Sequence, residues 1–125
     1  MDFAAIYVAE DDIATYTMKT IDDPRTLKKT IYLRPPENIL SQREVVQLWE
    51  NLIGKELNKS SISKEDFLSN LTGLDYAEQV GLTHYYHVCF EGCLANFEIG
   101  EDEEASKLYP DVNYTTVKNY LKRYV

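Results

Sequence analysis

The sequence predicts an α/β protein in which helices and strands are mixed within one unit, and three observations support this class. Residues 4–9 (AAIYVA) are apolar almost throughout, as in a short buried strand, and residues 13–21 then follow helical spacing. Residues 41–44 (SQRE) form a helix-capping signature before a second apolar helix pattern. Residues 28–34 alternate apolar and polar side chains, as a half-buried strand does. The length, 125 residues, is that of a single domain.

The first helix is expected to begin at the acidic run Glu10-Asp11-Asp12. Carboxylates there stabilise the positive end of a helix and can cap its free amides. Asp22-Asp23-Pro24 should end this helix, since the residue before a proline is pushed out of the helical region. The strand expected at 28–34 should stop at Pro35-Pro36, because proline cannot donate to a sheet.

The most regular helix pattern follows Ser41. Its side chain can accept a hydrogen bond from the Glu44 amide, while the Glu44 carboxylate accepts from the Ser41 amide. Gly54 stands where a residue of left-handed conformation ends such a helix. Residues 56–62 are expected to form a short strand or an extended link, and a second capped helix is expected from Ser63 to about Leu71.

The later part of the chain is predicted to hold one long helix and several short elements. Residues 76–95 have helical spacing but are apolar around most of the circumference, which predicts a helix buried on more than one side. A final short strand is expected at 96–99, followed by a solvated acidic turn at 100–104. The remaining helices are predicted at 104–109, cut by Pro110, and from Thr115 or Thr116 to the C-terminus.

Charge and composition exclude several classes of function. Thirteen Lys and Arg against 21 Asp and Glu give a net charge of −8, which argues against nucleic acid or an anionic membrane as partner. No apolar run approaches the length of a membrane span, and the N-terminus lacks the pattern of a secretion signal. We therefore expect a cytoplasmic protein whose two cysteines are reduced thiols.

The glycines exclude one further kind of site. There are five, and no two lie closer than eight residues. Loops that bind nucleotide phosphates need closely spaced glycines, because their backbone amides must approach the phosphate. Neither G-x-G-x-x-G nor G-x-x-x-x-G-K-[ST] occurs, so the sequence predicts no cofactor-binding residue of this type in these residues.

A narrow stripe of two imidazoles and a carboxylate, with Val80 beside them, runs along the helix predicted at 76–95. About 100° of rotation per residue places four side chains on one side: Val80, His84, His87 and Glu91. His87 and Glu91 could form an ordinary i,i+4 pair on a solvent-facing strip. The alternative is the wall of a cleft, where an imidazole binds a substrate hydroxyl or takes its proton. The residues alone leave both interpretations open.

Four side chains that can bind metals lie close together in the sequence: His84, His87, Cys89 and Cys93. On a helix the cysteines project almost opposite the histidines, so the four cannot surround one zinc ion. The same geometry disfavours a disulfide, and buried free thiols are the simpler interpretation. The acidic run 100–104 lacks the spacing of a calcium loop. We therefore predict no metal site, and no Ser-His-Asp or Cys-His-Asn set of catalytic residues is supported.

Long runs of the sequence resemble the plant isoflavone reductase-like proteins, which belong to the NmrA-like, atypical short-chain dehydrogenase/reductase family. These runs are Asp22–Ser41 (DDPRTLKKTIYLRPPENILS), Asn96–Gly100 (NFEIG) and Glu104–Val117 (EASKLYPDVNYTTV). Within that group, ENILSQREVVQLWE and the closing YLKRYV are most similar to pinoresinol-lariciresinol reductases. The resemblance extends from about residue 5 to the C-terminus.

The resemblance implies that residues 1–125 are a single partial domain, the C-terminal substrate-binding portion of a Rossmann-type NADPH reductase. Members of the family carry an N-terminal half with a glycine-rich NADPH loop and a catalytic lysine, which this chain lacks. The similarity to pinoresinol-lariciresinol reductases implies that the intact enzyme would reduce a phenolic lignan, delivering hydride to a quinone-methide-like intermediate as a benzylic ether opens. A homodimer is implied for the intact enzyme. We expect this chain alone to bind no NADPH and to be inactive.

The resemblance also indicates substrate-binding residues. In the reductases, a histidine at the position of His84 lies beside the substrate, so Val80 and His84 are implied as pocket residues, and helical spacing adds His87. Relatives commonly carry a basic residue, Gly and Asp where this chain has Glu91-Gly92-Cys93, and other residues at the position of His87. The other hypotheses are a non-enzymatic NmrA-like interaction module and a truncated gene product.

Overall fold

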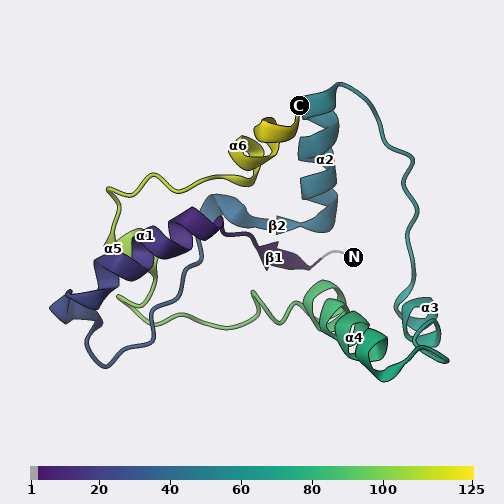
Figure 1. Cartoon of the computed structure of the whole chain (residues 1–125), viewed down its shortest axis with the longest axis horizontal. Coiled ribbons are helices and arrows are strands. Elements are labelled where there is room, and N and C mark those ends of the chain that lie inside the picture. Colours follow the sequence, from purple (N-terminus) through teal and green to yellow (C-terminus); the bar gives the residue numbers. More distant parts are fainter. Residues whose placement is uncertain (1–2) are drawn as a thin grey trace. The chain divides into compact units, whose positions relative to one another are not determined.

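A computed structural model describes residues 3–125 (Figure 1). Contacts between residues divide the chain into two compact units, each built from separate stretches of the sequence. Unit 1 contains residues 3–5 and Leu40–Asn96, and unit 2 contains Ile6–Ile39 and Phe97–Val125. Across the described residues, no helix is both long enough and apolar enough to span a membrane.

Two short strands, β1 (Ala4–Ile6) and β2 (Ile39–Ser41), pair in a two-stranded sheet. The boundary between the units passes through both strands. The strand predicted at 4–9 is therefore correct in position but too long. The strand ends at Ile6, although the Tyr7 N–H still donates to the Asn38 carbonyl at 3.1 Å, and a helix begins soon afterwards at Glu10.

Helix α1 (Glu10–Ile21) begins with the predicted acidic residues and ends, as predicted, before Asp22. The acidic run does not cap the helix, since the N-cap residue Ala9 makes no side-chain cap. Asp12 is instead buried, and its carboxylate accepts a hydrogen bond from the Thr115 N–H at 2.7 Å. The residue that we expected to serve the start of the helix therefore joins it to a distant segment.

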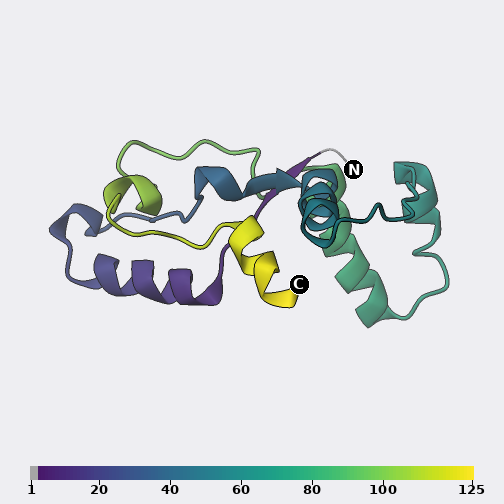
Figure 2. The ribbon, with the colours of Figure 1, turned by 90° about the horizontal axis from the view of Figure 1, so that it is seen from above.

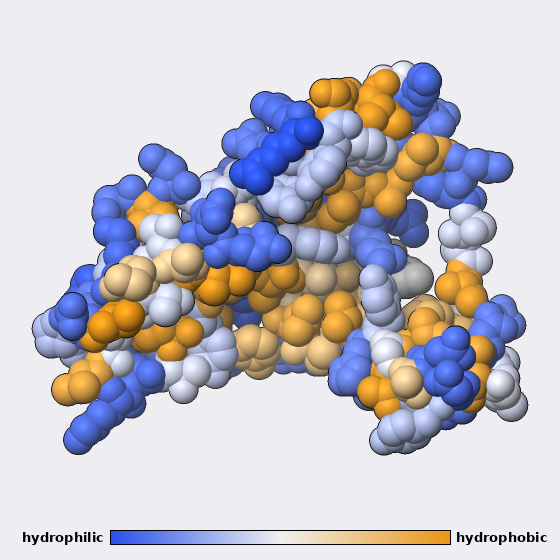
Figure 3. All heavy atoms as spheres, viewed as in Figure 1, coloured by the Kyte–Doolittle hydropathy of each residue, from blue (hydrophilic) through white to orange (hydrophobic). Residues whose placement is uncertain are grey.

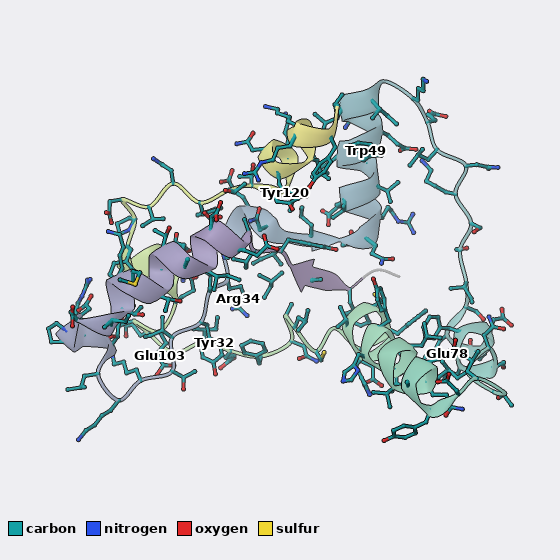
Figure 4. The ribbon with its side chains drawn as sticks, viewed as in Figure 1. Tyr32, Arg34, Trp49, Glu78, Glu103 and Tyr120 are labelled. Carbon is teal, nitrogen blue, oxygen red and sulfur yellow. The ribbon has the colours of Figure 1, made fainter. Side chains whose placement is uncertain are left out.

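The strand predicted at 28–34 is wrong, apart from a single parallel bridge between Tyr32 and Glu104. Lys28 adopts a φ of 59°, which interrupts extended backbone at the start of the segment. Farther along, the Tyr32 N–H donates to the Glu103 carbonyl at 2.7 Å (Figure 4). The alternating pattern thus reflects the partial burial of one side of an irregular segment.

Residues 96–99 form no strand either, contrary to the prediction. The Phe97 ring instead packs against the Tyr32 ring, with 5.3 Å between their centroids. The Phe97 carbonyl accepts a hydrogen bond from Arg34 Nη1 at 3.0 Å. The Phe97 side chain therefore packs against another aromatic ring, and the Arg34 side chain supplies the hydrogen bond that a neighbouring strand would have given to the Phe97 carbonyl.

The core of unit 2 lies between α1 and α5 (Ala105–Leu108), which face each other in Figure 2. Its buried members are Tyr16, Ala105, Leu108 and Tyr109. The partly buried residues packed against them are Ile31, Leu33, Val112 and Tyr114. Helix α5 matches the short helix that was predicted before Pro110.

Glu104 corrects the prediction of a solvated acidic turn at 100–104. The residue is only 6% exposed, and its carboxylate accepts hydrogen bonds from three backbone N–H groups. Ser106 and Lys107 donate at 3.1 and 3.0 Å from the first turn of α5. Arg34 donates at 2.9 Å from a segment 70 residues earlier in the chain. One side chain therefore caps a helix and holds an irregular segment beside it.

Asn38 is a second buried polar residue that the sequence did not reveal, and it is 1% exposed. Its Nδ2 donates to the Thr115 carbonyl at 2.9 Å, and its Oδ1 accepts from the Val117 N–H at 3.0 Å. The side-chain amide thus pairs with the backbone as a neighbouring strand would. These bonds fix the approach to α6 (Val117–Leu121), which is capped by Thr116, one of the two residues predicted to begin it.

Unit 1 contains the helix that the sequence described best, α2 (Gln42–Ile53). The Ser41 N–H donates to the Glu44 carboxylate at 2.7 Å, and the Glu44 N–H donates to Ser41 Oγ at 3.3 Å. Gly54 ends the helix with a φ of 66°. The predicted capping box and helix terminator are both confirmed.

An irregular connection joins α2 to α3 (Lys64–Ser69), and the predicted cap of α3 by Ser63 is confirmed (Figure 1). Of the two forms that we expected for residues 56–62, the structure has the extended link. Glu50 anchors this link, since its carboxylate accepts from the Leu57 N–H and from Lys59 Nζ, both at 2.6 Å. The Lys59 ammonium lowers the pKa of Glu50 from its ordinary value.

Candidate functional site

The candidate site lies on α4 (Tyr76–Phe90), the green helix of unit 1 in Figure 1. A capping box that sequence reasoning missed fixes the start of this helix. The Glu78 N–H donates to the Asp75 carboxylate at 2.9 Å, and the Asp75 N–H donates to the Glu78 carboxylate at 3.3 Å (Figure 4). The D-x-x-E spacing is the signal that could have revealed it.

Helix α4 ends at Phe90, five residues before the end predicted at Ala95. The chain turns because Gly92 adopts a φ of 66°, which other residues rarely tolerate. The Cys93 N–H then donates to the His87 carbonyl at 3.2 Å. The turn is also tightly packed, since a Cβ atom at Gly92 would lie 2.7 Å from the Phe3 ring. The apolar residues after Gly92 continue the helical spacing of the sequence, which is why the predicted helix was too long.

The three predicted site residues lie on α4 with exposed side chains. Val80 is 37% exposed, His84 is exposed, and the His87 side chain is 49% exposed. The His87 Nδ1 atom lies 2.6 Å from Glu91 Oε2, so the i,i+4 pair that the spacing allows is present. Tyr76 stands one turn before Val80 and is 83% exposed.

The opposite side of α4 packs against α3. The Tyr86 ring lies 6.3 Å from the Phe67 ring and 5.5 Å from the Phe90 ring, measured between centroids. Lys64 Nζ lies 5.1 Å from the centroid of the Tyr86 ring. The Tyr86 side chain raises the pKa of Lys64 above its ordinary value, and the Glu91 carboxylate adds to this effect. The Lys64 ammonium group therefore lies on the side of α4 that packs against α3.

The prediction that this helix is buried on more than one side is wrong for the chain as it stands. Tyr86 and Cys89 are its buried residues, whereas Tyr85 is 60% exposed. Figure 3 shows hydrophobic side chains reaching the surface in the region of α3 and α4, mixed with hydrophilic ones. An apolar circumference that meets solvent on one side leaves that side able to bind an apolar or aromatic molecule.

The two cysteines differ in their environments. Cys89 is buried and free, and burial raises the pKa of its thiol, which keeps it protonated and unreactive. Cys93 is free but exposed, because it lies beyond the end of α4, so the prediction of two buried thiols holds for one of them. Within residues 3–125, no group of three His, Cys, Asp or Glu side chains is placed to hold a metal ion.

The glycines of the structure do not form a cradle for the phosphates of a dinucleotide. Gly54 and Gly92 have positive φ values where α2 and α4 end, and Gly73 has one in the turn before α4. Each serves a helix boundary by itself, and a phosphate loop needs several glycines together at the start of a helix. Among the described residues, these three glycines therefore stand at separate helix boundaries.

Comparisons with known proteins identify relatives over almost the whole chain. The sequence profile of the NmrA-like family matches residues 3–121. The bifunctional pinoresinol-lariciresinol reductase of Linum album is 66% identical over 99% of this chain, which covers 38% of that protein. The bifunctional pinoresinol-lariciresinol reductase of Sinopodophyllum hexandrum is 70% identical over 96% of this chain, which covers 39% of that protein. The chain thus spans about two fifths of the length of these relatives.

Solved structures show the same similarity. The structure described as AtPrR2 with NADP+ and (+)pinoresinol matches 99% of this chain with a TM-score of 0.92 and 52% identity, and the match covers 40% of that chain. A crystal structure of isoflavone reductase matches 99% of this chain with a TM-score of 0.89 and 38% identity, and the match covers 41% of that chain. The mixed α/β fold is therefore that of one part of these reductases.

Proposed function

This chain belongs to the NmrA-like family, and on that premise we propose that it is the C-terminal, substrate-binding segment of an NADPH-dependent reductase of lignans. The observation that carries the proposal is the 66% identity to the Linum album reductase over 99% of the chain. Residues 1–125 would then form one partial domain of a longer enzyme. Its reaction would be the reduction of a benzylic ether of the pinoresinol and lariciresinol type.

Within that enzyme, α4 would provide one wall of the substrate pocket. Val80, His84 and His87 are the residues that we propose to contact the phenolic lignan. Their exposed side chains share one side of the helix, next to the exposed ring of Tyr76. An aromatic ring and an aliphatic side chain would pack against the rings of a lignan, and the imidazoles would bind its hydroxyl groups.

The cofactor would be NADPH, held by other parts of the longer enzyme, since these residues contain no phosphate loop. The proposal includes a homodimer for the intact enzyme. It places the protein in the cytoplasm, which suits two cysteines that are both free. The chain by itself should neither bind NADPH nor reduce a lignan, because positioning groups cannot replace the hydride donor.

Complementation tests the proposal. The full chain would be mixed with a separately expressed remainder of the Linum album reductase, and NADPH oxidation would be followed with pinoresinol. We expect turnover in the mixture and none with either part alone. In the mixture, His84→Ala should lower kcat/KM. Lys55→Ala, an exposed change outside α4, should leave it unchanged.

Two results would contradict the proposal. Turnover by the chain alone would show that it is a complete enzyme. A mixture that associates without turnover would instead favour the non-enzymatic interaction module. Association is measured by size-exclusion chromatography on the same samples. A mixture that associates without turnover is thereby identified directly.

A further inference from the structure

The contact between His87 and Glu91 is the most specific polar interaction on the exposed side of α4. Nδ1 of the imidazole lies 2.6 Å from Oε2 of the carboxylate, a short distance for a hydrogen bond. The two side chains are 49% and 43% exposed, so the contact forms at the surface where the substrate is proposed to bind. Glu91 is the first residue after α4 and lies just before the tightly packed turn at Gly92.

This contact determines which ring nitrogen carries the proton. An ionised carboxylate can only accept hydrogen bonds, so Nδ1 of His87 must be the donor. In the neutral ring, Nε2 is then an acceptor with a free lone pair. Nε2 is the atom farther from the helix backbone, and it belongs to a half-exposed side chain. Glu91 thus fixes the tautomer of His87 in which Nε2, at the surface, is a hydrogen-bond acceptor.

Two neighbouring side chains surround the pair. The Glu91 carboxylate is among the charges that raise the pKa of Lys64, which comes from α3. The Tyr86 ring meets the His87 ring edge to face, with 5.7 Å between centroids and 77° between planes. His84 lies one turn earlier on the same helix. The pair therefore has one charged neighbour from the adjacent helix and one aromatic support.

We propose that Glu91 is a positioning residue that holds His87 as a hydrogen-bond acceptor for a phenolic hydroxyl of the lignan. The inference rests on the proposed function, and it adds a specificity: a free phenol is recognised and its methyl ether is not. A phenol O–H can donate to Nε2, whereas an aryl methyl ether has no hydrogen to donate. The pair thus selects among lignans by their O-methylation.

The first measurement concerns the tautomer and uses the full chain without substrate. ¹⁵N NMR of the labelled chain at about pH 8, where imidazole is ordinarily neutral, reports which nitrogen carries the proton. We expect the His87 proton on Nδ1 in the wild type. In Glu91→Ala it should move in part to Nε2, and Glu91→Gln should hold it on Nδ1, because the amide carbonyl still accepts. A wild-type proton on Nε2 overturns the inference.

The second measurement concerns specificity and uses the complemented reductase. Dissociation constants for pinoresinol and for its di-O-methyl ether are determined by calorimetry without NADPH. The preference for pinoresinol should fall roughly tenfold in His87→Phe, since one net hydrogen bond is lost. It should fall to a smaller extent in Glu91→Ala and be retained in Glu91→Gln. Glu56→Ala removes the same charge from the exposed link before α3 and should change nothing.

The outcomes separate the inference from the proposed function. Loss of preference in His87→Phe and Glu91→Ala, with Glu91→Gln and Glu56→Ala unchanged, supports the inference. An unchanged preference in all four variants, in a mixture that oxidises NADPH with pinoresinol, overturns it and leaves the proposed function standing. A wild-type mixture without turnover refutes the proposed function and the inference with it.

Discussion

The two buried tyrosines of unit 2 provide a matched pair of perturbations, because their hydroxyl groups differ in what they meet. Tyr16 and Tyr109 are 3% and 6% exposed, and their ring centroids are 6.4 Å apart. The Tyr109 hydroxyl donates to Asp23 Oδ2 at 2.7 Å. The Tyr16 hydroxyl is buried without a hydrogen-bond partner among the described residues. Removing each hydroxyl by substitution with phenylalanine changes little else.

The expected magnitudes follow from these environments. A hydrogen bond to a charged group contributes about 1.5–3 kcal/mol to stability. Arg25 still binds Asp23 when the Tyr109 hydroxyl is removed, through contacts of 2.7–3.1 Å, so the carboxylate is not stranded. We therefore expect Tyr109→Phe to destabilise by about 1.5–2 kcal/mol. Tyr16→Phe removes a polar group that burial penalises, so it should be neutral or stabilise by up to about 1 kcal/mol.

Urea unfolding of the full chain measures both effects. The free energy of unfolding is compared at equal m-values, and the Tyr109→Phe/Asp23→Asn double variant closes a cycle that isolates the pair. The pKa shifts agree with this difference between the two hydroxyl groups. Burial raises the pKa of both tyrosines, and Asp23 contributes only to the pKa of Tyr109. Equal destabilisation by the two substitutions would refute the reasoning, because it would require a partner for the Tyr16 hydroxyl.

Three further predictions concern stability in the same assay. Gly92→Ala should lower the free energy of unfolding by about 2 kcal/mol or more, because alanine is strained in the left-handed backbone and its Cβ meets the Phe3 ring. Adding Phe3→Ala should restore only the part of this stability that the clash removes. Asn38→Ala should cost about 2–4 kcal/mol, since it leaves a partly buried carbonyl and a partly buried N–H unpaired. Asn38→Asp, which cannot donate to the carbonyl, should not rescue it. Hydrogen bonds from Arg25 hold the pKa of Asp23 well below its ordinary value, so its contribution is present above about pH 4 and is lost as the pH falls further. Asp23→Asn should flatten the stability profile in that acid range, and an unchanged slope would contradict this account.

The sequence predicted the helices that begin with local signals. Ser41 and Ser63 each cap a helix at the expected residue, and Thr116 caps the last one as the second of two expected residues, because a cap depends on atoms within one turn. The strands at 28–34 and 96–99 were wrong because strand formation depends on a partner far away in the sequence. The buried roles of the polar residues in unit 2 depend on the same long-range contacts and carry no local pattern.

For the candidate site, helical spacing placed Val80, His84 and His87 on one side of α4 and allowed the contact of His87 with Glu91. The end of the helix was misplaced, since the apolar residues that follow Gly92 match the helical pattern as well as those before it. That these side chains bind a lignan stays a prediction. A helix pattern fixes which side chains share a face, and it says nothing of what that face meets.

The hydrogen bonds of Asp12, Asn38 and Glu104 have a consequence for the order of folding. They join residues separated by 103, 77 and 70 positions, so unit 2 depends on contacts that close very long loops. During synthesis, the segment 40–96 is complete before the last part of unit 2 leaves the ribosome. Residues 6–39 must therefore wait for 97–125, with α1 and its apolar residues uncovered in the meantime. Residues 97–125 therefore complete the folding of residues 6–39.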